Sequence, residues 1–133
     1  MPSILFVCVA NSFRSQMAEV FARAIGGAAW EVASAGSHPS GHVHPLAIRL
    51  MGELKFDLSA QRSKGLDELP PRHWDYVVTM GCGDHCPTVP AQHRIDWELG
   101  DPAGLSLADA RRIRDQIGTL IQELLDHHRQ GES

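Results

Sequence analysis

The chain has 133 residues, of which 43% are hydrophobic and 21% are charged. This length and balance fit a single domain over residues 1–133 and exclude an intrinsically disordered chain. The formal net charge is -4 and no long run of Lys or Arg occurs, which argues against nucleic acid and anionic membranes as partners. No apolar run approaches the ~20 residues that span a bilayer, and the N-terminus lacks the basic start of a signal peptide. We therefore expect a cytoplasmic protein.

Predicted strands and helices alternate along the chain. Short apolar runs that end at polar turns predict strands, and apolar residues at helical spacing predict helices. Pro45 suits the first position of a helix, and Ser106 with Asp109 forms a capping-box pattern. In chain order, the sequence predicts a strand at Ser3–Val7, a helix at Gln16–Ile25, a strand at Trp30–Ser34, a helix from Pro45, a strand at Asp75–Met80, a strand at Arg94–Trp97 and a helix from Ser106 to about His127.

This alternation predicts an α/β fold of three layers, a four-stranded parallel sheet flanked by helices on both faces. In open sheets of this kind, ligands bind beyond the carboxyl ends of the strands. Cys8, the loop over residues 81–90 and Asp101 all follow predicted strands. We therefore expect these three parts of the chain to meet at one edge of the sheet.

The strongest chemical signal is the segment from Cys8 to Ser15, in which a Cys and an Arg are separated by five residues between a strand and a helix. Backbone N–H groups of a tight loop can form an anion nest, to which the helix N-terminus adds its positive dipole end. Arg14 is suited to hold two oxygens of a tetrahedral anion, and the same positive field favours the thiolate of Cys8. We predict that Cys8 and Arg14 are catalytic and that the oxyanion is bound by Val9, Ala10, Asn11, Ser12, Phe13, Arg14 and Ser15. The alternative is an apolar strand cysteine near an unrelated surface arginine.

The segment VCVANSFRSQMAE resembles the phosphate-binding loop of low-molecular-weight protein tyrosine phosphatases and of the arsenate reductases that share their fold. The likeness continues in the same order along the chain through Ser34–Gly36, His44–Pro45 and Asp101–Pro102. Phe13 departs from the family pattern, in which a cysteine or a small residue is common. The resemblance implies the phosphatase fold and the following roles: Cys8 as nucleophile, Arg14 as anion clamp, Asn11 as the residue that shapes the loop, Ser15 as thiolate partner and Asp101 as general acid.

Asp101 also fits a general acid on chemical grounds. A leaving oxygen must gain a proton as the thiolate displaces it, and a positioned carboxylic acid can supply that proton. Asp101 lies in a loop rich in Gly and Pro, where Pro102 favours an extended backbone. A structural turn aspartate is the alternative interpretation.

A second signal is the pair Cys82 and Cys86, which lies in a loop with two glycines. A phosphatase needs only Cys8, so two further thiols suggest a thiol relay. A single helical turn between the two cysteines brings them to about 6 Å, within disulfide range. The resemblance to thioredoxin-coupled arsenate reductases implies that Cys8 attacks arsenate, that Cys82 and Cys86 form a redox pair, and that thioredoxin restores the thiols. Because the two loop cysteines stand closer together than in well-known members, the order of their attacks is left open.

Several alternatives remain. One is a phosphatase that hydrolyses phosphomonoesters through a Cys8 phosphoenzyme, although Ala103–Gly104 provide no aromatic wall for a tyrosyl ring. A small thiol with a redoxin is the alternative reductant. Cys82, His85 and Cys86, with His93 as a candidate fourth ligand, have loose zinc-ligand spacing without a second clear ligand pair, so we expect no metal there. A non-catalytic oxyanion-binding module is a further alternative.

We expect no bound cofactor, with one possible exception. Glu19 and Ser34 match positions that resemble a monovalent-cation site in some arsenate reductases, which suggests a potassium ion. A solvated helix residue is the alternative interpretation of Glu19.

Overall fold

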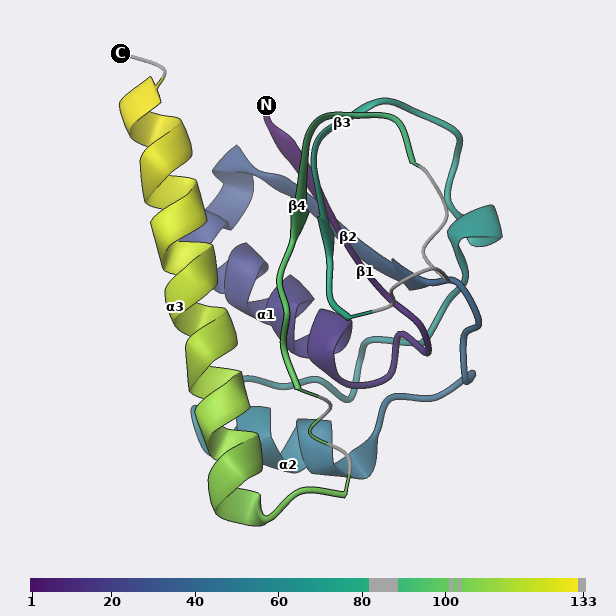
Figure 1. Ribbon diagram of the computed structural model, residues 1–133, viewed down its shortest axis with the longest axis vertical. Helices are drawn as coiled ribbons and strands as arrows, with labels where there is room; N and C mark the ends of the chain where they lie inside the picture. The colour runs from purple at the N-terminus through teal and green to yellow at the C-terminus, as the bar shows by residue number, and fades with distance from the viewer. Residues whose placement is uncertain (82–88, 101, 103, 132–133) are drawn as a thin grey trace.

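The computed structural model describes residues 1–81, 89–100, 102 and 104–131. Cys82, Cys86 and Asp101 lie outside the described residues, so their predicted roles stay predictions. Strands and helices alternate as the sequence predicts (Figure 1). The elements are β1 (Ser3–Cys8), α1 (Arg14–Gly26), the 3₁₀-helix η1 (Gly27–Ala29), β2 (Glu31–Gly36), α2 (Pro45–Gly52), the 3₁₀-helix η2 (Leu66–Glu68), β3 (Trp74–Thr79), β4 (Ala91–Asp96) and α3 (Leu107–Gly131).

The strands form one parallel sheet in the order β2-β1-β3-β4. Their carboxyl ends are level, because Cys8 pairs with Gly36 across β1 and β2, and Val7 pairs with Thr79 across β1 and β3. Thr79 in turn pairs with Asp96 at the end of β4. The segments that follow the four strands therefore leave the sheet at one edge, and the loop after Cys8 begins there.

In the described residues, α1, α2 and α3 lie on one face of the sheet (Figure 1), where they contribute to a single hydrophobic core. This core joins Ile4 and Phe6 of β1 to the helices, for example to Met17, Leu50 and Ile117. Each of these side chains is fully buried. Burial of apolar side chains on this face is therefore the main force that holds the helices on the sheet.

The opposite face has a thinner cover. A smaller cluster there packs Leu5 and Val77 against Leu66 and Leu69, in and next to η2. The predicted fold class is confirmed, but among the described residues η2 is the only helix in the second flanking layer. The chain between α2 and β3 has few apolar residues at helical spacing and ends in Pro70–Pro71, which disfavours a longer helix there.

Most element boundaries agree with the prediction to within one or two residues, and two differ by more. β4 starts at Ala91 rather than Arg94, because its backbone pairs with β3 although its side chains are mostly polar and exposed. α3 continues past His127 to Gly131, and its last turns are attached to the sheet by a 2.8 Å hydrogen bond between His128 Nδ1 and the Tyr76 hydroxyl. None of the described helices is long and apolar enough to cross a membrane.

Glu53, at the end of α2, connects this helix to α3. Its carboxylate forms ion pairs with Arg111 and Arg114, each at 2.7 Å. Hydrogen bonds from Arg111 and then Arg114 lower the pKa of Glu53 from an ordinary value of 4.5 to about 2. The folded protein therefore binds this proton less readily than the unfolded chain does. The resulting stabilisation is present above pH 4.5 and is lost as the pH falls toward 2.

We expect the free energy of unfolding, measured by urea denaturation at a series of pH values, to decrease between pH 4.5 and about 2. Glu53→Gln should make this decrease shallower, because the amide has no proton to gain. Glu123→Gln is the matched control, since Glu123 is an exposed α3 carboxylate without an ion pair among the described residues. Identical slopes for Glu53→Gln and the wild type would contradict this role of Glu53.

Candidate active site

The loop between β1 and α1 turns its carbonyl groups outward. Every carbonyl oxygen from Cys8 to Phe13 accepts a hydrogen bond from outside the loop, at 2.8 to 3.2 Å. In a planar trans peptide, a carbonyl and the following N–H point in opposite directions. The N–H groups of residues 9–14 therefore point toward the concave side of the loop. In order, the donors to the carbonyls are the backbone N–H groups of Ser37, His38 and Ser40, the side-chain amide of Gln16, and the backbone N–H groups of His44 and Met17.

A cavity of about 560 Å³ lies on this concave side. The Cys8 side chain is at its base, and the residue is only 3% exposed. α1 begins at this cavity. The side chain of its N-cap residue, Phe13, forms no capping hydrogen bond, and its first turn contains no acidic residue. Its first N–H groups are therefore left for an anion. The lining residues are Cys8, Val9, Ala10, Ser12, Phe13, Arg14, His44, Gly81 and Leu99.

Two hydrogen-bond donors converge on the sulfur of Cys8. The backbone N–H of Asn11 lies 3.2 Å from Sγ, and the hydroxyl of Ser15 lies 2.8 Å from it. Asn11 Nδ2 donates to Ser15 Oγ at 2.7 Å, so the hydroxyl proton of Ser15 is available for the sulfur. A thiolate accepts both bonds better than a neutral thiol does. This arrangement favours the nucleophilic form of Cys8.

Asn11 holds the centre of the loop. Its backbone φ of 48° lies in the left-handed region, which Asn tolerates better than most residues. Its side-chain oxygen accepts from Gln16 Nε2 at 3.0 Å and from the Lys64 backbone N–H at 2.9 Å. Its amide nitrogen donates to Ser15 and, at 3.0 Å, to Ser34 Oγ. All hydrogen-bonding groups of this fully buried side chain are thus used, which fits the predicted loop-shaping role.

Arg14 is held over the same cavity. One of its terminal nitrogens donates to the carbonyl of Leu99 at 3.0 Å. Gly81 leaves room for this guanidinium, because a Cβ there would lie 2.7 Å from Arg14 Nη1, and its φ of +72° also favours glycine. Within the described part of the chain, Arg14 forms no ion pair. Its positive charge is available to an oxyanion.

The structure also adds residues that the sequence did not indicate. Ser63 Oγ donates to the carbonyl of Ala10 at 2.9 Å, and the Gln16 side chain is fixed by Gln61 and by the carbonyl of Arg62. Residues 61–64 thus support the outer side of the loop. No motif in this polar stretch marks it, because its contacts are with residues far away in the sequence.

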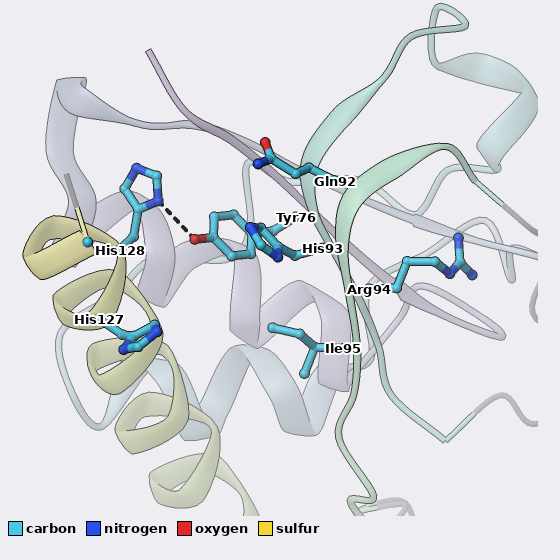
Figure 2. A pocket seen from close by; sticks show the side chains of 8 residues that line it. Tyr76, Gln92, His93, Arg94, Ile95, His127 and His128 are labelled. Carbon is cyan, nitrogen blue, oxygen red and sulfur yellow. Dashed lines mark hydrogen bonds between the residues drawn. The ribbon is translucent and has the colours of Figure 1, made fainter.

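A second cavity, of about 610 Å³, lies between β4 and the end of α3 (Figure 2). The Tyr76 ring stacks on His93 with centroids 5.0 Å apart, and its hydroxyl points to His128. This cavity shares no lining residue with the cavity at Cys8, and no thiol lines it. No group of His, Cys, Asp and Glu side chains suited to a metal occurs among the described residues. His93 and His128 both pack against Tyr76, and His128 also forms a hydrogen bond with it.

Gly36 lets β2 approach the anion loop, because a Cβ there would lie 2.5 Å from the carbonyl oxygen of Val9. We expect Gly36→Ala to displace the loop, to weaken phosphate binding at least ~10-fold, and to destabilise the fold by ~1–3 kcal/mol. Calorimetric titration with phosphate and thermal denaturation test this expectation. Gly52→Ala is the control, since nothing lies within 4 Å of a Cβ at that position. Unchanged phosphate affinity in Gly36→Ala would mean that the close approach is not required.

Known proteins are similar to this chain in sequence and in fold over nearly its whole length. The profile of the family described as low molecular weight phosphotyrosine protein phosphatase matches residues 3–132. A glutaredoxin arsenate reductase of Synechocystis is 38% identical over 128 residues, covering 94% of this chain and 97% of the relative.

Solved structures give the same result. An arsenate reductase in a phosphate-binding state has a TM-score of 0.85 and 36% identity, covering 96% of this chain and 98% of its own. A thioredoxin-dependent arsenate reductase of Corynebacterium glutamicum has a TM-score of 0.81 and 36% identity, covering 98% of this chain and 63% of its own. The chain therefore belongs to the low molecular weight phosphotyrosine protein phosphatase family, within which it is similar to arsenate reductases.

Proposed function

We propose that this protein reduces arsenate to arsenite by a relay of cysteine thiols and that thioredoxin restores the reduced form. One combination of features carries the proposal. A buried Cys8 thiol lies at the base of an oxyanion cavity that Gly81 also lines, and in the sequence Cys82 comes directly after Gly81, with Cys86 four residues further on. A phosphatase has no use for the additional thiols. We also propose that residues 1–133 act as one domain.

The first step binds arsenate and forms a sulfur–arsenic bond. The inward N–H groups of the loop and the guanidinium of Arg14 hold the oxygens, and the positive end of α1 adds to their field. The Cys8 thiolate attacks arsenic, and one oxygen leaves as water after it gains a proton. We propose that Asp101 supplies that proton. In the sequence, Asp101 is two residues after Leu99, whose carbonyl accepts a hydrogen bond from Arg14.

The second step reduces arsenic. The Cys82 thiolate attacks the sulfur of Cys8, a Cys8–Cys82 disulfide forms, and the electron pair of the sulfur–arsenic bond passes to arsenic, which leaves as arsenite. Cys86 then attacks Cys82, which releases the Cys8 thiolate and moves the disulfide to Cys82–Cys86. The two electrons that reduce arsenic are thus replaced when a dithiol reduces this last disulfide.

Thioredoxin is the reductant that we propose, in the cytoplasm, where thiols are kept reduced. The similarity to a thioredoxin-dependent arsenate reductase supports this choice. A small thiol with glutaredoxin is the second candidate, since a relative of similar identity is named a glutaredoxin arsenate reductase. Hydrolysis of phosphomonoesters is the second candidate activity, because Cys8, Arg14 and Asp101 would serve it equally well.

We propose that a potassium ion is not needed near Cys8. The Glu19 carboxylate is only 3% exposed and already contacts Lys64 Nζ at 3.5 Å, Arg23 at 2.9 Å and the Ser34 hydroxyl at 2.5 Å. Two cationic side chains therefore neutralise the group that would have to bind the ion. The Lys64 ammonium supplies the charge that orders Glu19, Ser34 and, through them, Asn11.

The relay is tested by NADPH oxidation with thioredoxin and thioredoxin reductase, with and without arsenate. We expect Cys82→Ser and Cys86→Ser to abolish continuous arsenate-dependent oxidation and to change p-nitrophenyl phosphate hydrolysis by less than about twofold. Cys8→Ser, the matched control, should abolish both. If Cys82→Ser retains arsenate turnover, the relay as described is wrong. If only glutathione with glutaredoxin supports turnover of the wild type, the reductant is the second candidate.

The cation proposal predicts equal arsenate turnover in potassium chloride and in choline chloride of the same ionic strength. Lys64→Met should lower turnover about tenfold, which corresponds to ~1.4 kcal/mol, because Glu19 loses a partner. Added potassium should then restore part of the activity. Lys55→Met, at an exposed position, is the control. A wild-type enzyme that requires potassium would show that Lys64 does not fill this role.

A further inference from the structure

His44 lies outside the anion loop but is attached to it. Its backbone N–H donates to the carbonyl of Ser12 at 2.8 Å. It is also the N-cap residue of α2, with Pro45 following in the first helical turn. The residue lines the oxyanion cavity together with Cys8 and Arg14. A side chain from the start of α2 therefore shares the cavity with the residues of the Cys8 loop.

The capping bond determines which ring nitrogen of His44 carries a proton. Nδ1 accepts the backbone N–H of Leu46 at 3.0 Å. A nitrogen that accepts a hydrogen bond has no proton, so the neutral ring carries its proton on Nε2. Among the described residues, this Nε2–H has no hydrogen-bond partner. The ring thus has an unused donor at a position that lines an oxyanion cavity.

Phe13 fixes the orientation of the His44 ring. The two ring centroids are 4.8 Å apart, with the planes tilted by 39°. Phe13 is only 5% exposed and precedes Arg14 at the start of α1, so its ring is held by the core. Packing on one side and the cap on another leave His44 little rotational freedom. A donor fixed in this way binds a ligand without a further loss of side-chain entropy.

We propose that His44 is an oxyanion-binding residue, whose Nε2–H donates to an oxygen of the bound tetrahedral anion. This assignment deepens the proposed function and rests on it for the identity of the substrate, arsenate. The imidazole is a neutral donor, so it adds a hydrogen bond to the anion without repelling the guanidinium of Arg14. Phe13 is the positioning residue of this donor.

The test separates the donor from the cap. Asn is a good N-cap residue, so His44→Asn keeps an acceptor for the Leu46 N–H and removes the ring donor, whereas His44→Ala removes both. The probe is inorganic phosphate, titrated calorimetrically into the reduced protein, with thermal denaturation beside it. His42→Asn is the matched control, because His42 is exposed and does not line the cavity.

We expect His44→Asn to melt close to the wild type and to bind phosphate about tenfold more weakly, the effect of one hydrogen bond to a charged group. Its KM for arsenate should rise more than its kcat falls. Wild-type phosphate affinity in His44→Asn would overturn the assignment. So would a loss of affinity that appears only in His44→Ala together with a lower melting temperature, since the cap alone would explain it. Wild-type protein that binds phosphate but reduces no arsenate would refute the proposed function, and the phosphate titrations would still decide the role of His44.

Discussion

The anion site depends on hydrogen bonds that point away from it. The loop after β1 presents its N–H groups to the cavity only because the carbonyls from Cys8 to Phe13 are bound on the outer side. Donors from residues 37–44 and from the first turn of α1 form this outer shell. A buried carbonyl without a donor is costly, so the shell fixes each peptide plane and with it the direction of each N–H. Gly36 is needed here because the two backbones nearly touch.

A polar network extends from this loop into the interior. It runs from Cys8 through Ser15, Asn11 and Ser34 to the buried carboxylate of Glu19. Buried polar groups stabilise a single arrangement only when every member has a partner, and no buried side-chain nitrogen or oxygen in the described residues lacks one. The Lys64 ammonium at the far end gives the network its own counter-charge. The sulfur is thus positioned by a hydrogen-bonded chain of side chains that continues from the loop into the interior.

One oxyanion cavity can serve two chemistries. The inward N–H groups and Arg14 suit any tetrahedral oxyanion, and the Cys8 thiol can attack the central atom of either substrate, so this geometry by itself does not separate ester hydrolysis from reduction. The difference lies in whether a second thiol can attack the first sulfur. Gly81 lines the cavity, and the next residue in the chain is Cys82. The position of Cys82 in the sequence, directly after a residue of the cavity, favours the reductase. The family relationship alone does not make that distinction.

The sequence by itself determined the features that depend on the spacing of nearby residues. The apolar run of β1, the helical spacing of α1 and the five residues between Cys8 and Arg14 identified the strand, the helix and the anion loop between them. It did not find the start of β4, whose polar residues become a strand only by pairing with β3. Nor did it find the contacts between Lys64 and Asn11 or between Arg14 and Leu99, which are 53 and 85 residues apart. Such contacts form only because the folded sheet brings together backbone segments that are far apart in the sequence. They do not recur at a regular spacing, so the sequence contains no pattern from which to predict them.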